Sequence, residues 1–388
     1  MKKLLIVFAI ALLSNIAFSQ EGYKFTDVKR LPTTSVKDQY ASGTCWAFSG
    51  ISFIESEMTK LGTKLEDVPD ISEMYIVRKC YEAKAEKYVR MHGTINFAGG
   101  GSFFDNFWCA KNYGLVPEEL YTGLNYGLNK HNHDELDKVL KAYVEVLKDQ
   151  SKLTTAWLAG FNGILDAYFG KVPENFTYKG KSYTPRTFAD QVVKINPDDY
   201  VSITSYTHHP FWQSFILEIP DNWIWEASYN VPMEDMVKIA DYAINNGYTI
   251  AWGADVSEPY FSHKDGYAIV PDLPENELVR TERSRWESVD RTKMQLDKPG
   301  KEKVITQEMR QTGFNNFKTT DDHGMHIVGI AKDQNGTEYY IVKNSWNTDN
   351  PFGGYVYVSK AYFMYKTMNF VVHKNGIPAD IKTKLGIK

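Results

Sequence analysis

The chain has 388 residues, of which 43% are hydrophobic and 14% aromatic, and it carries a formal net charge of −4. This length allows one large domain or two, and the apolar fraction is that of a protein with a sizeable core. The acidic balance argues against a surface for nucleic acid, which needs an excess of basic residues, so we expect no nucleic-acid partner.

The first 19 residues have the composition of a secretory signal peptide. Two lysines precede an apolar run over residues 4–13, and the small residues Ala17 and Ser19 follow. The apolar run is too short to span a bilayer, so no stable membrane anchor is expected. The pattern predicts that residues 1–19 are removed and that residues 20–388 form an exported protein, periplasmic or secreted, of a bacterium.

A candidate nucleophile lies in the segment Gln-Tyr-Ala-Ser-Gly-Thr-Cys-Trp-Ala-Phe-Ser, residues 39–49. Turn and capping residues precede apolar residues at helical spacing, which predicts a helix with Cys45 in its first turn. Unpaired N–H groups and the positive end of the helix dipole favour a thiolate there. We therefore interpret Cys45 as a nucleophile and Gln39 as an oxyanion donor. A buried structural thiol is the alternative for a lone cysteine.

The other two cysteines, Cys80 and Cys109, lie in apolar segments with a helical pattern. Three cysteines are an odd number, so at least one thiol stays unpaired within the chain, and Cys45 is the natural one. The sequence leaves open whether Cys80 and Cys109 form a disulfide or remain reduced.

Residues 120–201, approximately, predict a helical insertion, as in the amphipathic run over residues 133–148. His131 and His133 stand at the start of that run, where we expect capping residues and solvated histidines rather than a metal site. His208 and His209 precede a proline and are interpreted as a turn. The sequence predicts no metal ligands and no cofactor.

Two later segments supply a base and an orienting group. Residues 321–329, Asp-Asp-His-Gly-Met-His-Ile-Val-Gly, indicate a turn that runs into a strand, with His323 as the candidate base. His326 would point to the opposite face of that strand, so we expect it to be a core residue. Residues 340–346, Tyr-Ile-Val-Lys-Asn-Ser-Trp, indicate a buried strand that ends beside Asn344.

The segments that hold Cys45, His323 and Asn344 resemble, in this chain order, the catalytic segments of papain-like cysteine peptidases. Asn-Tyr-Gly-Leu-Val-Pro-Glu at residues 112–118 and Ala-Trp-Gly-Ala-Asp-Val at residues 251–256 resemble the bleomycin hydrolase and aminopeptidase C branch. The resemblance covers most of the chain. It implies an α+β papain-like fold of two lobes, one helical and one β-barrel-like, with a helical insertion.

The resemblance also implies a role for each catalytic candidate. His323 would hold the Cys45 thiolate and protonate the leaving amine, and Asn344 would accept a hydrogen bond from the imidazole and fix its tautomer. Gln39 and the backbone N–H of Cys45 would stabilise the oxyanion. Trp346 would shield the bond between His323 and Asn344 from water.

Substrate contacts are implied at Gly100, Gly101 and Trp346. In papain-like peptidases the glycine pair lines the cleft and hydrogen-bonds the substrate backbone, and glycine suits this because no side chain blocks the approach. A flexible loop without this role is the alternative. Asn347 departs from the family pattern, which has glycine after the tryptophan.

Members of the branch form hexameric rings and lay a C-terminal arm in the cleft, where the terminal carboxylate meets the amino group of the peptide. The resemblance thus implies peptide substrates, a homo-oligomer and aminopeptidase activity, with residues 370–388 as the arm and Lys388 as the source of the carboxylate. The arm lacks a Pro-Met-Gly ending, so an endopeptidase is an alternative. A silent binding or scaffold protein and an acyltransferase are further alternatives, and the acyltransferase is disfavoured because Asn344 stands where such enzymes commonly have an acidic residue.

Overall fold

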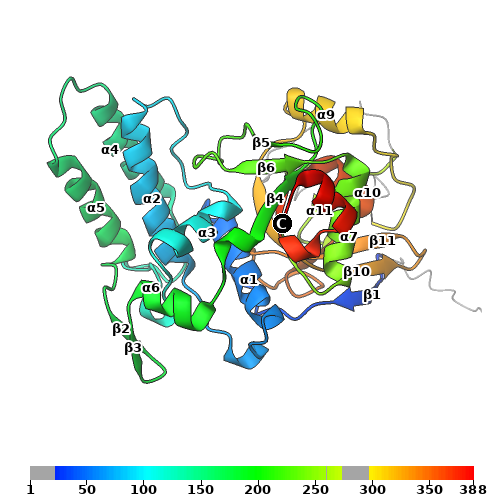
Figure 1. Cartoon of the computed structure of the whole chain (residues 1–388), viewed down its shortest axis with the longest axis horizontal. Helices are drawn as coiled ribbons and strands as arrows, with labels where there is room; N and C mark the ends of the chain where they lie inside the picture. Colours follow the sequence, from blue (N-terminus) through cyan, green and yellow to red (C-terminus); the bar gives the residue numbers. More distant parts are fainter. Residues whose placement is uncertain (1–21, 259, 273–296) are drawn as a thin grey trace, which may run out of the picture.

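The computed structural model describes residues 22–258, 260–272 and 297–388, and the chain forms a helical lobe beside a β-rich lobe (Figure 1). Helix α1 (Cys45–Lys60) lies between them and packs against α3 (Phe103–Asn112) and β10 (His323–Asp333). Its residues from Trp46 to Met58 are buried on every face, as expected for a helix enclosed by two layers. The expected α+β class is confirmed.

The helical lobe begins with α2 (Glu73–Arg90), whose N-cap Ser72 accepts a hydrogen bond from the Tyr75 N–H at 3.1 Å. Helix α3 begins at a capping box formed by Ser102 and Asp105. Both helices therefore start at short polar side chains that satisfy their first N–H groups.

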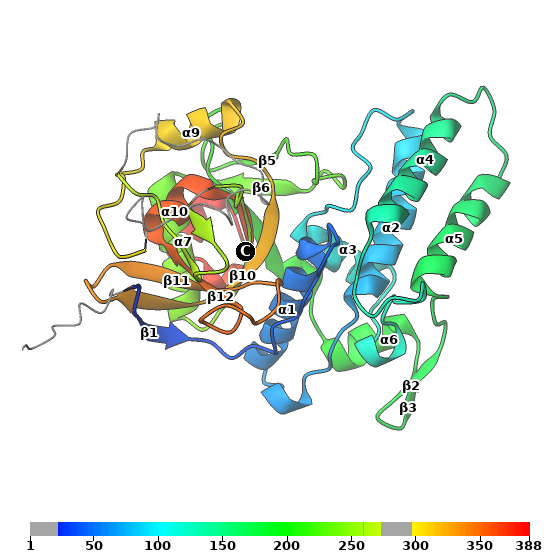
Figure 2. The same ribbon diagram turned by 180° about the vertical axis from the view of Figure 1, so that it is seen from behind.

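The stretch from residue 120 to 201 extends this lobe (Figure 2). Its elements are α4 (Asp134–Lys148), α5 (Ala156–Phe169), the hairpin of β2 (Phe176–Tyr178) and β3 (Lys181–Tyr183), and α6 (Pro185–Phe188). Leu136, Leu140 and Val144, spaced four residues apart on α4, are fully buried and share one hydrophobic core with α1 and α2. The helical periodicity did not predict the β2–β3 hairpin.

The strands of the β-rich lobe form one mixed sheet in the order β5-β6-β4-β13-β7-β10-β11-β12-β9-β8, and β1 (Phe25–Arg30) pairs with β10. The pairs β4–β6 and β9–β12 are parallel, and the other pairs are antiparallel. The remaining strands are β4 (Tyr200–Thr204), β5 (Ser214–Ile216), β6 (Ala227–Asn230), β7 (Ile250–Ala254), β8 (Phe261–Ser262), β9 (Tyr267–Ala268), β11 (Glu338–Lys343), β12 (Tyr355–Ser359) and β13 (Thr367–His373).

Helices pack against this sheet, and one of them is the last element of the chain. They are α7 (Met233–Asn245), α9 (Gln307–Asn315), α10 (Lys360–Lys366) and α11 (Ala379–Leu385). Residues 370–373 belong to β13, between β4 and β7, so they are part of the sheet rather than of an arm. The last helix, α11, buries Ile381 and Leu385 in the core of the β-rich lobe.

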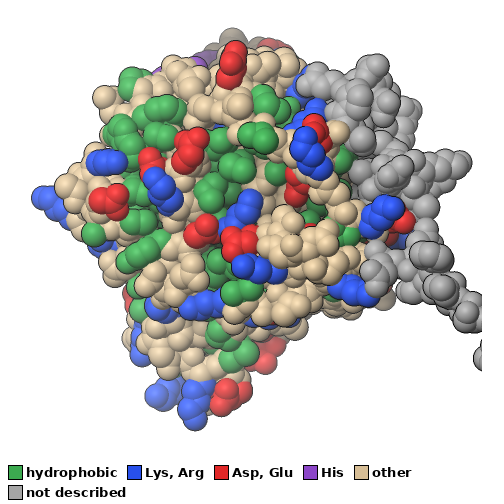
Figure 3. Space-filling model, turned by 90° about the vertical axis from the view of Figure 1, so that its right-hand side faces the viewer, with side chains coloured by type: hydrophobic (Ala, Val, Ile, Leu, Met, Phe, Trp, Pro, Cys, Tyr) green, Lys and Arg blue, Asp and Glu red, His purple; other side chains and the backbone are tan. Residues whose placement is uncertain are grey.

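The face of the β-rich lobe in Figure 3 carries lysines, arginines and carboxylates interspersed with apolar side chains. The described side chains on this face therefore form no large patch of one charge sign. Within the described ranges, no helix combines the length and the apolar character needed to cross a membrane.

Candidate active site

Two neighbouring strands bring His323 and Asn344 together. Strands β10 and β11 are antiparallel and pair His326 with Lys343, so the first residue of β10 and the residue after β11 lie at the same edge. His323 Nε2 donates a hydrogen bond to Asn344 Oδ1 at 2.7 Å, and both side chains are buried. Strand β10 also packs against α1, the helix that begins with Cys45.

Cys45 and His323 line one narrow cavity of about 20 Å³. The cavity lies where the start of α1, the start of β10 and the segment before α3 meet. Its lining residues are Cys45, Trp46, Gly101, Ser102, Phe103, Ile219, Asp221, Gly253, Asp321, Asp322, His323, Gly324 and Asn369. Two candidates from distant parts of the sequence, the thiol and the imidazole, therefore share one pocket.

The amide of Asn344 has a second set of partners. Its Oδ1 also accepts from the backbone N–H of Ser345 at 2.8 Å, and its Nδ2 donates to His263 Nδ1 at 3.1 Å. His263 Nε2 lies 4.0 Å from Asp349 Oδ1. Sequence reasoning missed His263, because it stands in a short turn between β8 and β9 and no motif surrounds it.

Trp346 covers the pair formed by His323 and Asn344. The indole lies against the His323 ring, with centroids 4.4 Å apart and planes inclined by 31°, and it meets the His263 ring edge-on at 5.4 Å. The indole is itself buried. The indole therefore covers one face of the His323 ring.

Gln39 is buried beside the same strand end. Its Oε1 accepts from the Ser345 hydroxyl at 2.5 Å, and its Nε2 donates to the Ser42 carbonyl at 2.8 Å. A carboxamide nitrogen carries two N–H groups, so one remains beyond the bond to Ser42. Gln39 is thus fixed in orientation, although it is not part of the cavity lining.

The glycine pair accommodates very close neighbours. A Cβ on Gly101 would lie 2.5 Å from Asp105 Oδ2 and 2.8 Å from Trp46 Cε2, and a Cβ on Gly100 would lie 2.1 Å from Asp221 Oδ2. Any larger residue would therefore clash at both positions. Gly101 lines the Cys45 cavity, and Gly100 lies directly beneath the carboxylate of Asp221.

The electrostatic environment of Cys45 differs from the expectation of a thiolate. Burial, reinforced by the charges of Asp221 and Asp321, raises the pKa of Cys45 to about 12, although the backbone N–H groups of Gly324 and Trp46 act in the opposite direction. Desolvation and the two carboxylates outweigh the helix terminus. Burial therefore opposes ionisation of Cys45 in the unliganded protein, so removal of its proton calls for a base.

His326 lies away from the cavity, as the alternation along a strand predicts. Its Nδ1 is 2.9 Å from the Ser52 hydroxyl, and its ring meets Phe53 edge-on at 5.9 Å. Burial, with a smaller effect of Lys343, holds the pKa of His326 well below its usual range. It is a neutral core residue. The remaining cysteines, Cys80 and Cys109, are buried free thiols, which answers the question that the sequence left open.

Three side chains of metal-ligand type meet outside this site, among the residues that the structure describes. The Nε2 atoms of His208 and His209 lie 3.1 Å and 3.0 Å from the two carboxylate oxygens of Glu218. All three side chains are partly exposed. The other histidine pair corrects an expectation: His133 is fully buried rather than solvated, and burial lowers its pKa to about 3 because the helix start packs against Phe169.

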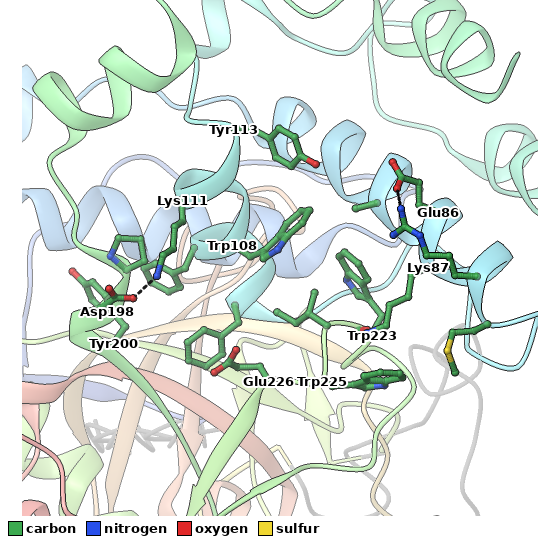
Figure 4. Close-up of a pocket in the computed structure, with 17 residues that line it drawn as sticks. Glu86, Lys87, Trp108, Lys111, Tyr113, Asp198, Tyr200, Trp223, Trp225 and Glu226 are labelled. Carbon is green, nitrogen blue, oxygen red and sulfur yellow. Dashed lines mark hydrogen bonds and ion pairs between the residues drawn. The ribbon is translucent and has the colours of Figure 1, made fainter. Parts of the chain in front are cut away.

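A second, larger cavity of about 770 Å³ opens between α2, α3 and residues 223–226 (Figure 4). Trp108, Trp223 and Trp225 supply its aromatic walls, and Lys87 and Glu226 are among its charged side chains. None of its lining residues belongs to the Cys45 cavity. The larger space is therefore a separate feature of the surface.

The comparisons with known proteins agree with the fold. The model of the Peptidase C1-like family matches residues 75–387. Aminopeptidase G of Lactobacillus delbrueckii subsp. lactis is 24% identical, with 90% of this chain and 83% of that protein covered. Aminopeptidase C of Streptococcus thermophilus is 22% identical, with 90% and 82% covered. The crystal structure of PepW from Lactobacillus rhamnosis is 18% identical, with 93% and 84% covered and a TM-score of 0.69.

These relatives correct the predicted localisation. A further relative is named "Cysteine proteinase 1, mitochondrial", from Saccharomyces cerevisiae, 22% identical with 94% of this chain and 80% of that protein covered. None of these four relatives is named as an exported protein. The prediction of a periplasmic or secreted protein is therefore wrong. It rested on the composition of residues 1–19, which lie outside the described residues, and a charged, apolar start does not by itself determine the compartment.

Proposed function

The chain belongs to the Peptidase C1-like family, in the bleomycin hydrolase branch of papain-like enzymes, and on this premise we propose that it is a cysteine aminopeptidase with a Cys45–His323–Asn344 site. The main support from the structure is the 2.7 Å hydrogen bond from His323 Nε2 to Asn344 Oδ1 beside the cavity that holds Cys45. This bond occupies Nε2, so proton exchange with the thiol falls to Nδ1.

The proposed reaction proceeds in two steps. His323 takes the proton of Cys45, the sulfur attacks the peptide carbonyl carbon, and the imidazolium returns the proton to the leaving amine. Water, activated by the same imidazole, then hydrolyses the thioester. Asn344 holds the ring in the required tautomer, and Trp346 excludes water from the hydrogen bond between them.

Stabilisation of the oxyanion is assigned to two N–H donors. One is the backbone N–H of Cys45, at the start of α1, and the other is the second Nε2–H of Gln39. The bonds of Gln39 to Ser42 and Ser345 hold its carboxamide in place before substrate arrives. The backbone of Gly101 lines the cavity, which supports its assignment to the substrate main chain.

Hydrolysis of two fluorogenic peptides tests this function. One peptide has a free amino terminus, and its partner is acetylated. We expect the wild-type protein to cleave the free peptide, and we expect Cys45→Ala or prior alkylation of Cys45 to abolish cleavage. Cleavage of the acetylated peptide at a similar rate would indicate an endopeptidase, and cleavage that survives Cys45→Ala would exclude the proposed nucleophile.

Family membership also supports assembly into a homo-oligomer, a hexamer in the branch that the chain resembles. Sedimentation velocity of the purified protein tests this. A single species of monomer mass at micromolar concentration would contradict it.

A further inference from the structure

A loop of the β-rich lobe crosses to the helical lobe beside the active site. Residues 217–226, named here the strap, join β5 to β6, which pair with each other at the edge of the sheet. Lys87 of α2 donates through Nζ to the carbonyl of Trp223 at 2.5 Å, and the Trp223 indole donates to Asp105 Oδ2 of α3 at 2.6 Å. Figure 4 shows Trp223 and Trp225 beside Lys87. The strap thus connects the two lobes.

The base of the strap is fixed as well. Glu218 accepts hydrogen bonds from the side chains of His208 and His209, at 3.1 Å and 3.0 Å. Asn222 donates through Nδ2 to the carbonyls of Leu217 and Glu226, at 3.1 Å and 3.0 Å, and so closes the loop upon itself. Hydrogen bonds therefore hold the ends of the strap and its tip at Trp223, and they fix the position of residue 221 between them.

The strap brings Asp221 into the Cys45 cavity. Its Oδ2 occupies the space above Gly100, and Oδ1 accepts a long hydrogen bond of 3.4 Å from Asn96. Lys84 lies nearby, but its ammonium donates to the carbonyls of Ala98 and Gly100. Asp221 has no ion-pair partner among the described residues. It is half-buried and therefore open to a ligand in the cavity.

A second carboxylate lines the same cavity from the β-rich lobe. Asp321 comes two residues before His323, and the charges nearest to it are those of Asp221 and Asp322. Asp322 has its own partners, the Ser257 N–H at 3.1 Å and the Thr320 hydroxyl at 2.8 Å. Burial, together with the charges of Asp221 and Asp322, raises the pKa of Asp321 well above its usual range, and burial also raises the pKa of Asp221. The two carboxyl groups thus lie beside the nucleophile, where a cation would stabilise their charged forms.

We propose that the strap closes the cleft beside Gly100 and that Asp221, assisted by Asp321, binds the free α-ammonium group of the peptide substrate. The inference rests on the proposed function and deepens it, because it identifies the group that makes the enzyme specific for amino termini. An ammonium donates charge-assisted hydrogen bonds to carboxylates, whereas an acetylated terminus has no charge to donate.

The same binding event affects the nucleophile. Asp221 and Asp321 both raise the pKa of Cys45 while the cavity is empty, with Lys84 as the nearest opposing charge on Asp221. A substrate ammonium between the two carboxylates offsets their charge. The proton of Cys45 then moves more readily to His323, so a substrate with a free amino group promotes its own cleavage.

Steady-state kinetics of Asp221→Asn and Asp321→Asn on the free and acetylated peptides test the proposal. For the free peptide we expect KM to rise about tenfold or more in Asp221→Asn, with a smaller rise in Asp321→Asn, because a charge-assisted hydrogen bond is lost. The preference for the free over the acetylated peptide should fall by the same factor. Asp198→Asn is the matched control, since it removes one exposed carboxylate that pairs with Lys111 outside the Cys45 cavity.

Alkylation of Cys45 by iodoacetamide, followed by mass spectrometry at pH 7, is the second readout. Loss of either carboxylate lowers the pKa of Cys45, so both variants should react faster than wild type while they turn over the free peptide less efficiently. A merely unfolded variant would expose Cys80 and Cys109 to the reagent as well.

The outcomes separate this proposal from the proposed function. Unchanged KM and unchanged selectivity in both variants, with active wild-type enzyme, would overturn the ammonium assignment and leave the peptidase assignment intact. Wild-type protein that is alkylated at Cys45 and yet hydrolyses neither peptide would overturn both.

Discussion

At the scale of single residues, Asn344 connects several groups of the candidate site. Its Oδ1 accepts from His323 and from the Ser345 N–H, so its Nδ2 must be the atom that faces His263. An amide nitrogen can only donate, so Nδ1 of His263 accepts and its proton resides on Nε2, toward Asp349. One chain of polar groups thereby fixes the Asn344 amide and, through it, the His323 tautomer.

We expect His263→Ala to lower kcat about tenfold with little change in KM, because Asn344 loses the acceptor that fixes its orientation and His323 is then less well aligned. The alkylation rate of Cys45 should also fall, because His323 is the base that removes the proton of the thiol. His92→Asn, at an exposed histidine, serves as the control. Equal kcat values for His263→Ala and wild type would show that Asn344 keeps its orientation without this contact.

Asn347 stands where the family pattern has glycine, and its backbone conformation shows why asparagine is tolerated there. Its φ is +64°, in the left-handed region where glycine is favoured and asparagine is tolerated. Its Oδ1 accepts from the Asp349 N–H at 2.9 Å, which stabilises the turn locally. The turn after Trp346 therefore keeps a conformation suited to glycine although its residue is asparagine.

At the scale of secondary-structure elements, α1 combines the nucleophile at its first residue with a buried acid near its end. Glu57 is almost fully buried and accepts a hydrogen bond of 3.2 Å from the hydroxyl of Tyr200 at the start of β4. Burial raises the pKa of Glu57 to about 8, and the bond from Tyr200 only partly offsets this. The contact between α1 and the sheet therefore favours a protonated carboxyl.

The stability of the fold should decrease as the pH rises because of Glu57. Its folded-state pKa is above that of an exposed glutamate, so its contribution is full below pH about 4.5 and is lost as the pH rises through about 8. Urea unfolding at pH 6 and pH 9 measures the loss, on the order of 3 kcal/mol. Glu57→Gln should reduce it, whereas Glu234→Gln, at an exposed acid on α7, should not; equal losses in both variants would contradict the assignment.

At the scale of the whole molecule, none of the residues that line the Cys45 cavity belongs to the C-terminal helix. Helix α11 is held by Ile381 and Leu385 in the core of the β-rich lobe. Asn369 is the last residue in the chain to line the Cys45 cavity. The resemblance implied that Lys388 anchors the substrate amino group, whereas the structure offers Asp221 of the strap at the cavity itself.

Two truncations distinguish these anchors. Removal of residues 386–388 should leave the preference for free amino termini unchanged and should lower stability only modestly, because Ile387 is only partly buried against the core. Removal of residues 379–388 should lower the free energy of unfolding by several kcal/mol, since two large apolar side chains leave the core. Thermal unfolding and the paired peptides measure both effects. Cleavage of the acetylated peptide by the shorter truncation would restore Lys388 as the anchor.

The sequence by itself determined the family, the α+β class and the candidates Cys45, His323 and Asn344. Each of these residues stands at a boundary that local pattern reveals: the start of a helix, the start of a strand and the end of a strand. The β2–β3 hairpin escaped prediction because three-residue strands show no periodicity. The tertiary structure alone decided the contact of His263 with Asn344, the placement of Asp221 over Gly100 and the raised pKa of Cys45. These features depend on contacts between loops that are distant in the sequence and on the removal of side chains from water. A local run of residues reveals neither of these.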